Sequence, residues 1–375
     1  MKIMFLIFSF NTGGIERLLI DMCNTMSAQG HSITLCVINK DYELPLLDEL
    51  SPAVTRLLMD RPMGDANKRS YMKQLARIIR KGKYDILHCQ GLNCVLFSIL
   101  AKLRFPHVKL LNTVHDVNNF PRYTRMQILF HNTLCSHIIA ISETVKQEIL
   151  ARGTNSKQVT TIYNAIDTER FALCEHPHIN LGKAQSITYP EAINIGNVAR
   201  IMPAKKGQMI LLQAINRLKK FFPAIHCYFA GEVAANCQDQ FQELQDYIRC
   251  NHLENHVTFL GNVKDIPKFL ATLDIFVLPS FYEGFGISLI EALATGIPCI
   301  ASRLDGPAEI MESPALGTLF TPGDANELAD KLTDMIAHYD KYEPDIIAQT
   351  IANKYSIHTL VTSHIQIYKN CHKIQ

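Results

Sequence analysis

The chain has 375 residues, of which 47% are hydrophobic and 19% are charged, and its net charge is +2. This length exceeds one ordinary hydrophobic core and predicts two domains, and the composition excludes an intrinsically disordered chain. No uninterrupted apolar segment approaches the ~20 residues that a membrane-spanning helix needs, so we do not expect an integral membrane protein.

The eleven cysteines are scattered, and none forms a Cys-x-x-Cys pair. This pattern favours reduced thiols in a cytosolic protein over a disulfide framework or a zinc site. The N-terminal apolar run MKIMFLIFSF is followed by NTGG and by no small-residue cleavage site. We therefore interpret it as a buried first strand and not as a signal peptide.

Short β-branched runs alternate with helical patterns along the first half, which is typical of βαβ units in a parallel sheet. Residues 15–30 carry apolar side chains at three- and four-residue spacing and end at a glycine, which predicts a helix. The predicted strands of this half are residues 2–10, 31–39, 84–91, 108–116, 137–142 and 159–166.

Residues 172–191 lose this periodicity and are predicted to form a connector. A second series of strands is predicted at residues 192–201, 225–232, 256–261, 274–280 and 297–302. The pattern indicates two Rossmann-like domains with a cleft between them. Because ligands of such sheets bind at the carboxyl ends of the strands, functional residues should directly follow strands.

Gly13 and Gly14 follow the first predicted strand and open the first helix, where backbone N–H groups and the helix dipole attract anions. An ordinary tight turn explains two glycines equally well. The third glycine of the Gly-x-Gly-x-x-Gly dinucleotide fingerprint is missing, which disfavours an NAD-dependent dehydrogenase.

Arg200 and Lys206 follow the first strand of the second series, in a loop bounded by Gly207. A guanidinium can grip a diphosphate bidentately, and an ammonium adds a point charge. On these two residues alone, a solvated basic loop is the favoured interpretation.

Glu283 and Glu291 interrupt an otherwise apolar stretch. Gly284 and Gly286 prevent a continuous helix through Glu283, which predicts a loop there and a helix that begins near Ile287. Glycines let backbone amides approach a ligand closely, and carboxylates accept hydrogen bonds from sugar or ribose hydroxyls. The alternative is a capping role for Glu283 and a surface position for Glu291.

His115 and Asp116 end one predicted strand of the first series, and Asn164 and Asp167 close its last strand. Each alone is more simply explained as a turn or core residue, whereas together they indicate a site at the strand ends. The chain has no Asp-x-Asp pair and no His and Cys cluster with metal-ligand spacing. Cationic side chains and backbone dipoles would therefore have to neutralise a bound diphosphate.

With these motifs the sequence resembles the retaining GT-B glycosyltransferases of glycosyltransferase family four, over nearly the whole chain. The resemblance is strongest in PSFYEGFGISLIEALATGIPCIASRLDGPAEI and continues through GTLFTPGDANELADKL. Glu283 and Glu291 match the family's two glutamates separated by seven residues. NVARIMPAKKG is similar to its diphosphate-binding loop, FNTGGIERL to its N-terminal glycine loop, and YNAID to its interdomain boundary motif.

The resemblance implies a role for each matching residue. Arg200 and Lys206 would hold the diphosphate of a nucleotide sugar, and Glu291 would bind the ribose hydroxyls. Glu283 and the neighbouring amides would bind the donor sugar, which His115 would contact from the other domain. The expected catalytic residues are His115, Glu283, Arg200 and Lys206; the expected donor-binding residues are Gly13, Gly14, Arg200, Lys206, Glu283, Gly284, Phe285, Gly286, Ile287 and Glu291; and Asn164 and Asp116 are expected on the interdomain and acceptor side.

The implied fold is α/β, of GT-B type, with two parallel sheets facing a central cleft. The first domain would comprise residues 1–172 and about 357–375, because a helix at about 357–372 would cross back to it; the second would comprise about 190–356. Ala199 stands where a glycine commonly precedes the phosphate arginine. Cys89 and Gln90 stand where many relatives carry a second histidine, a departure that concerns the acceptor side.

The implied activity is retaining transfer of a hexose or N-acetylhexosamine from a nucleotide sugar, a UDP-sugar above all, to a saccharide or lipid-linked acceptor. A role in bacterial capsule, O-antigen or lipopolysaccharide synthesis is expected, without a metal or other cofactor and without a nucleic-acid partner. A nucleotide-sugar 2-epimerase of the same fold and a non-catalytic partner subunit are the alternatives. The glutamate spacing favours a transferase over the epimerase, and the intact Arg200, Lys206 and Glu283 disfavour an inactive subunit.

Residues 1–175 contain 21 Lys and Arg against 15 Asp and Glu, so this half is basic. Its basic stretches at 73–83 and 120–125 fit a surface that meets anionic lipid, at the inner face of the plasma membrane. A solvated helix face and loop explain them at least as well. The expected location is therefore the cytoplasm, with or without peripheral membrane contact.

Overall fold

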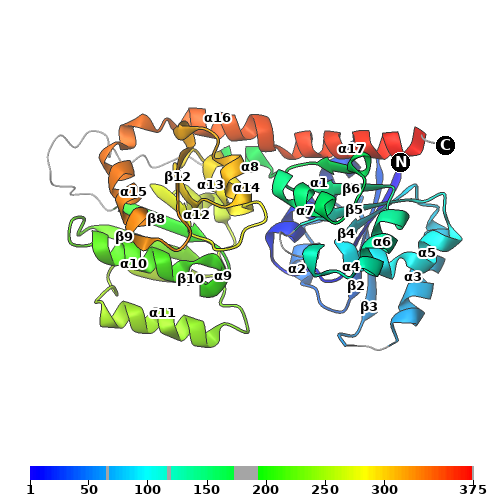
Figure 1. The fold of residues 1–375 in the computed structure, drawn as a ribbon, viewed down its shortest axis with the longest axis horizontal. Helices are drawn as coiled ribbons and strands as arrows, with labels where there is room; N and C mark the ends of the chain where they lie inside the picture. Colours follow the sequence, from blue (N-terminus) through cyan, green and yellow to red (C-terminus); the bar gives the residue numbers. More distant parts are fainter. Residues whose placement is uncertain (65–66, 116–119, 173–192, 374–375) are drawn as a thin grey trace. The chain divides into compact units, whose positions relative to one another are not determined.

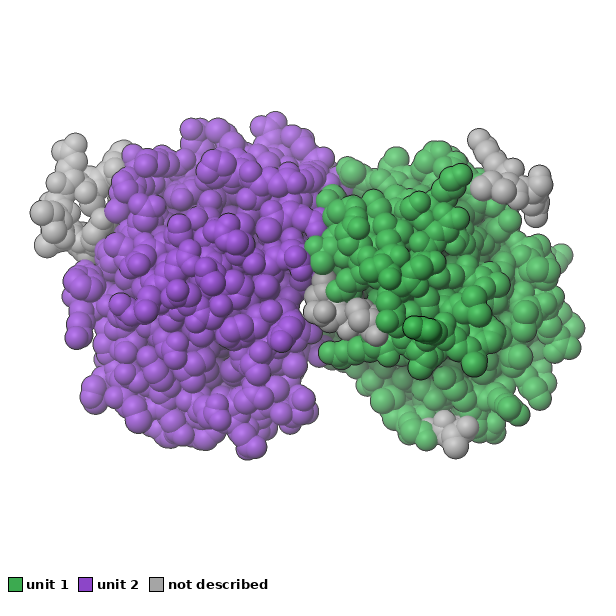
Figure 2. Space-filling view, in the orientation of Figure 1, with its two compact units in different colours: residues 1–166, 357–375 green, residues 167–356 purple. Residues whose placement is uncertain are grey.

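The computed structural model describes residues 1–64, 67–115, 120–172 and 193–373. The chain forms two compact units, coloured separately in Figure 2. Unit 1 comprises Met1–Ile166 and Ile357–Gln375, and unit 2 comprises Asp167–Ser356. Most of the predicted connector at residues 172–191 lies outside the described residues.

Unit 1 is built on a seven-stranded parallel sheet with the strand order β3-β2-β1-β4-β5-β6-β7 (Figure 1). The strands are β1 (Lys2–Ile7), β2 (Ser32–Asn39), β3 (Thr55–Arg61), β4 (Ile86–Gln90), β5 (Lys109–Val114), β6 (His137–Ala140) and β7 (Val159–Thr161). Consecutive residues of β1 and β2 are buried, so both faces of the sheet are covered. A continuous apolar run is therefore what this sheet requires of a central strand.

The sequence did not predict β3. This strand lies at the edge of the sheet, and only Met59 in it is buried. An edge strand has one strand neighbour and a solvent-exposed side, which tolerates charged residues such as Arg56 and Asp60. Without a long apolar run, the pattern that identifies the central strands is missing.

Helices of unit 1 connect the parallel strands. They are α1 (Gly14–Ala28), α2 (Leu44–Leu47), α3 (Lys68–Gly82), α4 (Leu92–Phe97), α5 (Ile99–Arg104), α6 (Arg125–Leu134), α7 (Glu143–Ala151) and α17 (Ile357–Lys373), with short 3₁₀ turns at Phe120–Arg122 and Ser156–Gln158. The predicted first helix corresponds to α1, and Gly30 follows it with a positive φ of 82°. The predicted C-terminal helix is α17, which returns the chain to unit 1 and packs against α1.

Unit 2 contains a six-stranded parallel sheet with the order β10-β9-β8-β11-β12-β13. Its strands are β8 (Ile193–Val198), β9 (Ile225–Ala230), β10 (Val257–Gly261), β11 (Ile275–Leu278), β12 (Cys299–Ser302) and β13 (Gly317–Phe320). The four-residue edge strand β13 was not predicted. It begins at Gly317 with φ at 130°, where an added Cβ would lie 1.9 Å from the carbonyl oxygen of Cys299.

The helices of unit 2 are α8 (Thr168–Ala172), α9 (Pro203–Lys206), α10 (Gln208–Leu218), α11 (Gln238–Cys250), α12 (Ile266–Leu270), α13 (Ile287–Ala294), α14 (Asp305–Ile310), α15 (Ala325–Ala337) and α16 (Pro344–Tyr355), with 3₁₀ turns at Pro314–Leu316 and Tyr339–Lys341. The first domain was expected to end at residue 172, but unit 1 ends at Ile166, before the short helix α8. Residues 167–172 belong to unit 2, because α8 packs against α13 and α16 and buries Phe171.

A buried polar cluster ties α17 to the sheet of unit 1. The hydroxyl of Tyr368 lies 2.6 Å from Nδ1 of His88 on β4, and the hydroxyl of Thr113 on β5 lies 2.7 Å from its Nε2. On α17 itself, Nδ1 of His364 donates to the carbonyl oxygen of Leu360 at 2.8 Å. Burial lowers the pKa of His88 well below its usual range and lowers the pKa of His364 to about 4.

These buried imidazoles make the stability of unit 1 depend on pH. An unfolded histidine has a pKa of about 6.5, so the unfolded chain binds more protons than the folded one between about 6.5 and the lowered folded pKa. The stabilisation is complete above the unfolded pKa and is lost as the pH falls. In His364→Leu we expect the loss of unfolding free energy between pH 7 and pH 5 to shrink, by up to about 1.4 kcal/mol per pH unit.

Urea unfolding followed by circular dichroism at the two pH values measures this difference. His358, exposed on the same helix, provides the matched control His358→Leu, which should keep the pH dependence of the unchanged chain. An equal pH dependence in all three proteins would show that His364 does not titrate on unfolding.

Candidate functional site

In unit 2 the loop after β8 carries the two predicted cationic residues. Arg200 is exposed two residues after the strand, and Lys206 ends the short helix α9. The amide Nε2 of Gln208, a fully buried residue, donates to the carbonyl oxygen of Arg200 at 2.9 Å. The backbone of Arg200 is therefore held by the buried side chain of Gln208, a residue that the sequence analysis did not single out.

Lys206 forms an ion pair with Glu283, the predicted glutamate in the loop after β11. Its Nζ lies 2.6 Å from Oε2 of Glu283, and the two side chains are 20% and 15% exposed. The hydroxyl of Ser280, which is fully buried, donates to the same carboxylate oxygen at 3.3 Å. Carboxylate and ammonium are thus brought together at the carboxyl edge of the sheet, between the loops that follow β8 and β11.

The close approach of these two loops depends on Gly207. Its φ is +67°, and a Cβ at this position would lie 1.9 Å from the carbonyl oxygen of Pro279. A second contact joins the same loops, because the amide of Phe281 donates to the carbonyl oxygen of Lys205 at 2.9 Å. Only a glycine fits between the Lys206 loop and the end of β11 without a backbone shift.

The loop from Gly284 to Gly286 leads directly into α13, which begins at Ile287 as predicted. Gly286 has φ at 111°, a conformation that favours glycine. Phe285 is 2% exposed, with its ring centroid 5.6 Å from that of Tyr355. This anchor in the core presents the flanking glycine backbone at the edge of the sheet.

The loop also packs against α14, and the second predicted glutamate lies on α13. A Cβ on Gly306 of α14 would lie 2.5 Å from Cα of Phe285, so the loop and α14 are in close contact. Glu291 is half-buried at the fifth of the eight positions of α13, the helix that begins where the sequence predicted.

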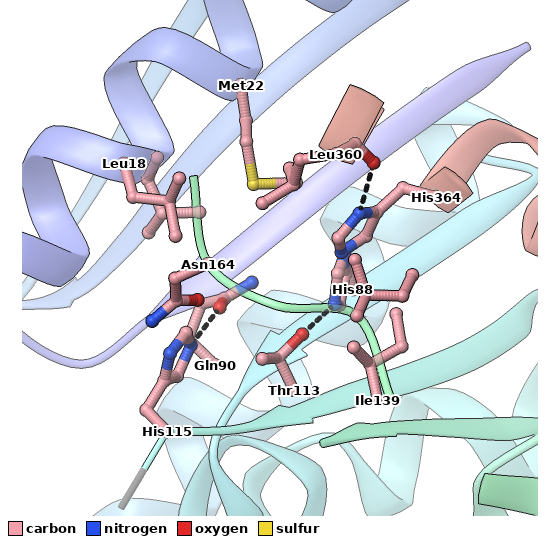
Figure 3. Close-up of a pocket in the computed structure, with 12 residues that line it drawn as sticks. Leu18, Met22, His88, Gln90, Thr113, His115, Ile139, Asn164, Leu360 and His364 are labelled. Atoms are coloured by element: carbon pink, nitrogen blue, oxygen red, sulfur yellow. Dashed lines mark hydrogen bonds between the residues drawn. The ribbon is translucent and has the colours of Figure 1, made fainter. Parts of the chain in front are cut away.

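In unit 1, His115 follows β5 and lies beside Gln90 at the end of β4. Nε2 of His115 is 2.7 Å from Oε1 of Gln90. Burial lowers the pKa of His115 to about 4, with a smaller contribution from His364. Both side chains line a pocket together with Asn164, which is 4% exposed (Figure 3).

The other predicted residues of the first half that the structure describes do not line the pocket of His115. Gly13 is the N-cap of α1 with φ at −170°, an extended conformation that any residue adopts, and Gly14 is the exposed first residue of that helix. Asp167 belongs to unit 2, where its carboxylate accepts from the amide of Arg170 in the first turn of α8. Asp116 lies outside the described residues.

The predicted residues therefore form two groups. In unit 2, Lys206 and Glu283 form an ion pair beside the glycine loop, and Arg200 stands earlier in the loop that carries Lys206. In unit 1, His115 and Asn164 line one pocket. Across the described ranges of the chain, no group of three or more His, Cys, Asp or Glu side chains could hold a metal ion. In the same ranges, no helix has the length and apolar character needed to cross a membrane.

Comparison with known families identifies both halves of the chain. The model for glycosyltransferase family 4 matches residues 12–170, and the model for group 1 glycosyl transferases matches residues 192–338. The first match covers the glycine loop, His115 and Asn164, and the second covers Arg200 through Glu291.

Relatives of known name agree with these matches. An uncharacterised glycosyltransferase of Methanocaldococcus jannaschii is 23% identical over 362 residues, which cover 91% of this chain and 90% of the relative. The lipopolysaccharide 1,6-galactosyltransferase of Escherichia coli is 24% identical over 78% of this chain and 77% of its own length. Among solved structures, Anabaena HepE in complex with UDP and glucose has a TM-score of 0.82 at 23% identity, over 98% of this chain and 99% of that one.

The glycine between the two loops of unit 2 can be tested directly. Gly207→Ala places a methyl group against a backbone carbonyl and also puts alanine at positive φ, which alone costs about 1–2 kcal/mol. Gly261→Ala is a matched control in the same unit, because Gly261 has φ at +64° and no atom within 4 Å of an added Cβ. We expect Gly207→Ala to lower the unfolding free energy by about 1–3 kcal/mol more than the control, because of overpacking.

Denaturant unfolding of the two variants measures the difference. Equal losses would mean that the loop moves away from β11 at no cost.

Proposed function

Because the chain belongs to the group 1, family 4 glycosyltransferases, we propose that it transfers a hexose or N-acetylhexosamine from a UDP-sugar to a saccharide or lipid-linked acceptor with retention of configuration. The observation that carries the proposal is the Lys206–Glu283 pair in the loops that follow β8 and β11, where an ammonium and a carboxylate meet at the strand ends of unit 2. The UDP and glucose held by HepE, of the same fold, support the choice of donor.

The chemistry of these side chains fits a nucleotide sugar. Arg200 can grip the diphosphate bidentately, and Lys206 adds a second positive charge. Glu283 and the backbone amides of Phe285 and Gly286 are suited to hydroxyls of the donor sugar. Glu291, on α13, is assigned to the ribose hydroxyls.

Transfer would proceed by electrostatic stabilisation of the leaving group. The bond between the anomeric carbon and the phosphate oxygen breaks, and the diphosphate leaves with its electron pair. Arg200 and Lys206 would stabilise that developing charge, and such stabilisation is usually the largest single catalytic contribution. The acceptor oxygen then bonds to the anomeric carbon on the face that the diphosphate left, and the acceptor proton passes to a phosphate oxygen.

His115 and Asn164 of unit 1 would contact sugar hydroxyls, because both are neutral hydrogen-bonding groups in a buried pocket. Gly13 and Gly14 would let the substrates approach the start of α1. A single imidazole with a lowered pKa is suited to binding a hydroxyl and poorly suited to binding phosphate.

The biological setting that we propose is bacterial surface polysaccharide synthesis, as the name of the lipopolysaccharide galactosyltransferase relative suggests. The protein would act in the cytoplasm at the inner face of the plasma membrane. Exposed lysines and arginines of α3 offer a basic surface for anionic lipid, namely Lys68, Arg69, Lys73, Arg77, Arg80 and Lys81.

A thermal-shift screen identifies the donor. A ligand that binds the native state raises the melting temperature, by an amount that grows with its concentration relative to Kd. We expect UDP and UDP-sugars to raise the Tm without added divalent metal, and GDP- and ADP-sugars to raise it less. A larger shift with a GDP- or ADP-sugar would overturn the assignment of the nucleotide.

Substitution of the cationic loop tests catalysis. We expect Arg200→Ala to lower kcat/KM for sugar transfer by roughly 10²–10³, the loss typical of removing one group that stabilises transition-state charge. Glu283→Gln should also reduce transfer while leaving Lys206 a hydrogen-bond acceptor, which Glu283→Ala would not. The control is Arg249→Ala, an exposed arginine paired with Asp246 on α11 of the same unit.

The assay follows release of UDP and formation of the glycosylated acceptor. Unchanged transfer in both Arg200→Ala and Glu283→Gln would reject the site. An epimerised nucleotide sugar, with the diphosphate linkage intact and no acceptor required, would instead identify a 2-epimerase.

A further inference from the structure

Gln90, a departure from the family pattern, contacts the predicted site residue His115. It ends β4, and its neighbour across the parallel ladder is Thr113 of β5, two residues before His115. Its amide oxygen Oε1 lies 2.7 Å from Nε2 of His115. An amide oxygen can only accept a hydrogen bond, so the ring nitrogen facing it must carry the proton.

This contact determines the state of the whole imidazole. A neutral histidine has one N–H, and the nitrogen that does not carry it is an acceptor. With the proton on Nε2, Nδ1 of His115 is left with an unshared electron pair. Gln90 therefore decides which ring nitrogen accepts a hydrogen bond.

The remaining polar atom of each side chain has no hydrogen-bond partner among the described residues. Nδ1 of His115 and Nε2 of Gln90 are buried polar atoms without a hydrogen bond. Buried polar groups in proteins nearly always have a partner, which is protein, ordered water or a ligand, so these two atoms on neighbouring strand ends are open to a hydroxyl group. Both residues line the pocket that also includes Asn164, and Figure 3 shows their mutual bond within it.

We propose that Gln90 is a positioning residue for the glycosyl transfer proposed above: it holds His115 in the Nε2–H tautomer, so that Nδ1 accepts the hydroxyl proton of a bound sugar. The amide N–H of Gln90 supplies a donor at the same pocket. A sugar hydroxyl both donates and accepts, so an imidazole acceptor and an amide donor are complementary to it. A phosphate oxygen offers no proton to Nδ1 and is disfavoured here.

The surroundings keep this pair neutral. His115 is half-buried, and within the described ranges the titratable groups that face it are His88 from β4 and His364 from α17, both of which have lowered pKa values. Neutral neighbours leave the choice of tautomer to the hydrogen bond with Gln90. This inference rests on the proposed function for the identity of the ligand, but the tautomer itself does not.

The tautomer can be measured without any substrate. In the 375-residue chain with ¹⁵N-labelled histidine, long-range ¹H–¹⁵N spectra distinguish a protonated Nε2 from a protonated Nδ1. His115→Asn identifies the signal by its loss. We expect His115 as the Nε2–H tautomer near neutral pH, and the Nδ1–H tautomer would overturn the proposal even if the protein proves to be an active transferase.

Substitutions of Gln90 test its role in turnover. Gln90→Met keeps the length of the side chain and removes the acceptor, so His115 should populate both tautomers and kcat/KM should fall roughly tenfold, as for one lost hydrogen bond. Gln90→Glu keeps the acceptor and should retain the Nε2–H form. Its carboxylate also stabilises the imidazolium, so the acid limb of the kcat/KM profile should move toward neutral pH.

Gln147→Met, at an exposed glutamine of α7, is the matched control and should leave activity and spectra unchanged. Melting curves establish that each variant is folded. An unchanged tautomer and unchanged kcat/KM in Gln90→Met would overturn the positioning role, as would identical pH profiles for Gln90→Met and Gln90→Glu. Failure of the unchanged protein to turn over any nucleotide sugar, with the Nε2–H form observed, would reject the proposed function alone.

Discussion

A parallel sheet covered on both faces confines polar chemistry to the ends of its strands. In β1 and β11 the interior residues are buried, so the strand bodies have no room for a side chain that must meet a ligand. The carboxyl ends of parallel strands all lie at one edge, which gathers the loops that follow them. Gln90 ends such a strand in unit 1, and His115 in unit 1 and Arg200 and Glu283 in unit 2 follow strands in this way.

The ion pair of unit 2 shows how such an edge can hold charge. Lys206 and Glu283 are both mostly buried, and isolated charges there would carry a large desolvation cost. Each neutralises the other, and Ser280 adds a hydrogen bond to the carboxylate. Removing one partner therefore leaves the other buried and unpaired, so truncation of either residue reports both on ligand binding and on the integrity of the loop. A neutral isostere separates these two effects better than alanine.

The sequence predicted most of the architecture because central strands of a buried parallel sheet have continuous apolar runs. It missed β3 and β13, which are edge strands with short or charged sequences. The start of α13 was predicted from glycine positions, which are local information. The chain boundary near residue 172 was misplaced because the packing of α8 against α13 and α16 is not encoded locally.

The contacts within the candidate sites could not be predicted in the same way. The Lys206–Glu283 pair joins residues 77 positions apart, and the bond of His88 to Tyr368 joins residues 280 positions apart. Strand order determines such contacts, and periodicity does not reveal strand order. Gln90 illustrates the limit, since its position at a strand end was readable while its bond to His115 depends on β4 and β5 being neighbours.

The two units differ in the kind of group that they present, and the difference follows from burial. In unit 1 desolvation keeps His88, His115 and His364 neutral near physiological pH, so this pocket offers hydrogen bonds without net charge. In unit 2 Arg200 is exposed and Lys206 forms an ion pair with Glu283, so this loop presents basic side chains. A neutral pocket selects hydroxyls, and a cationic loop selects phosphate.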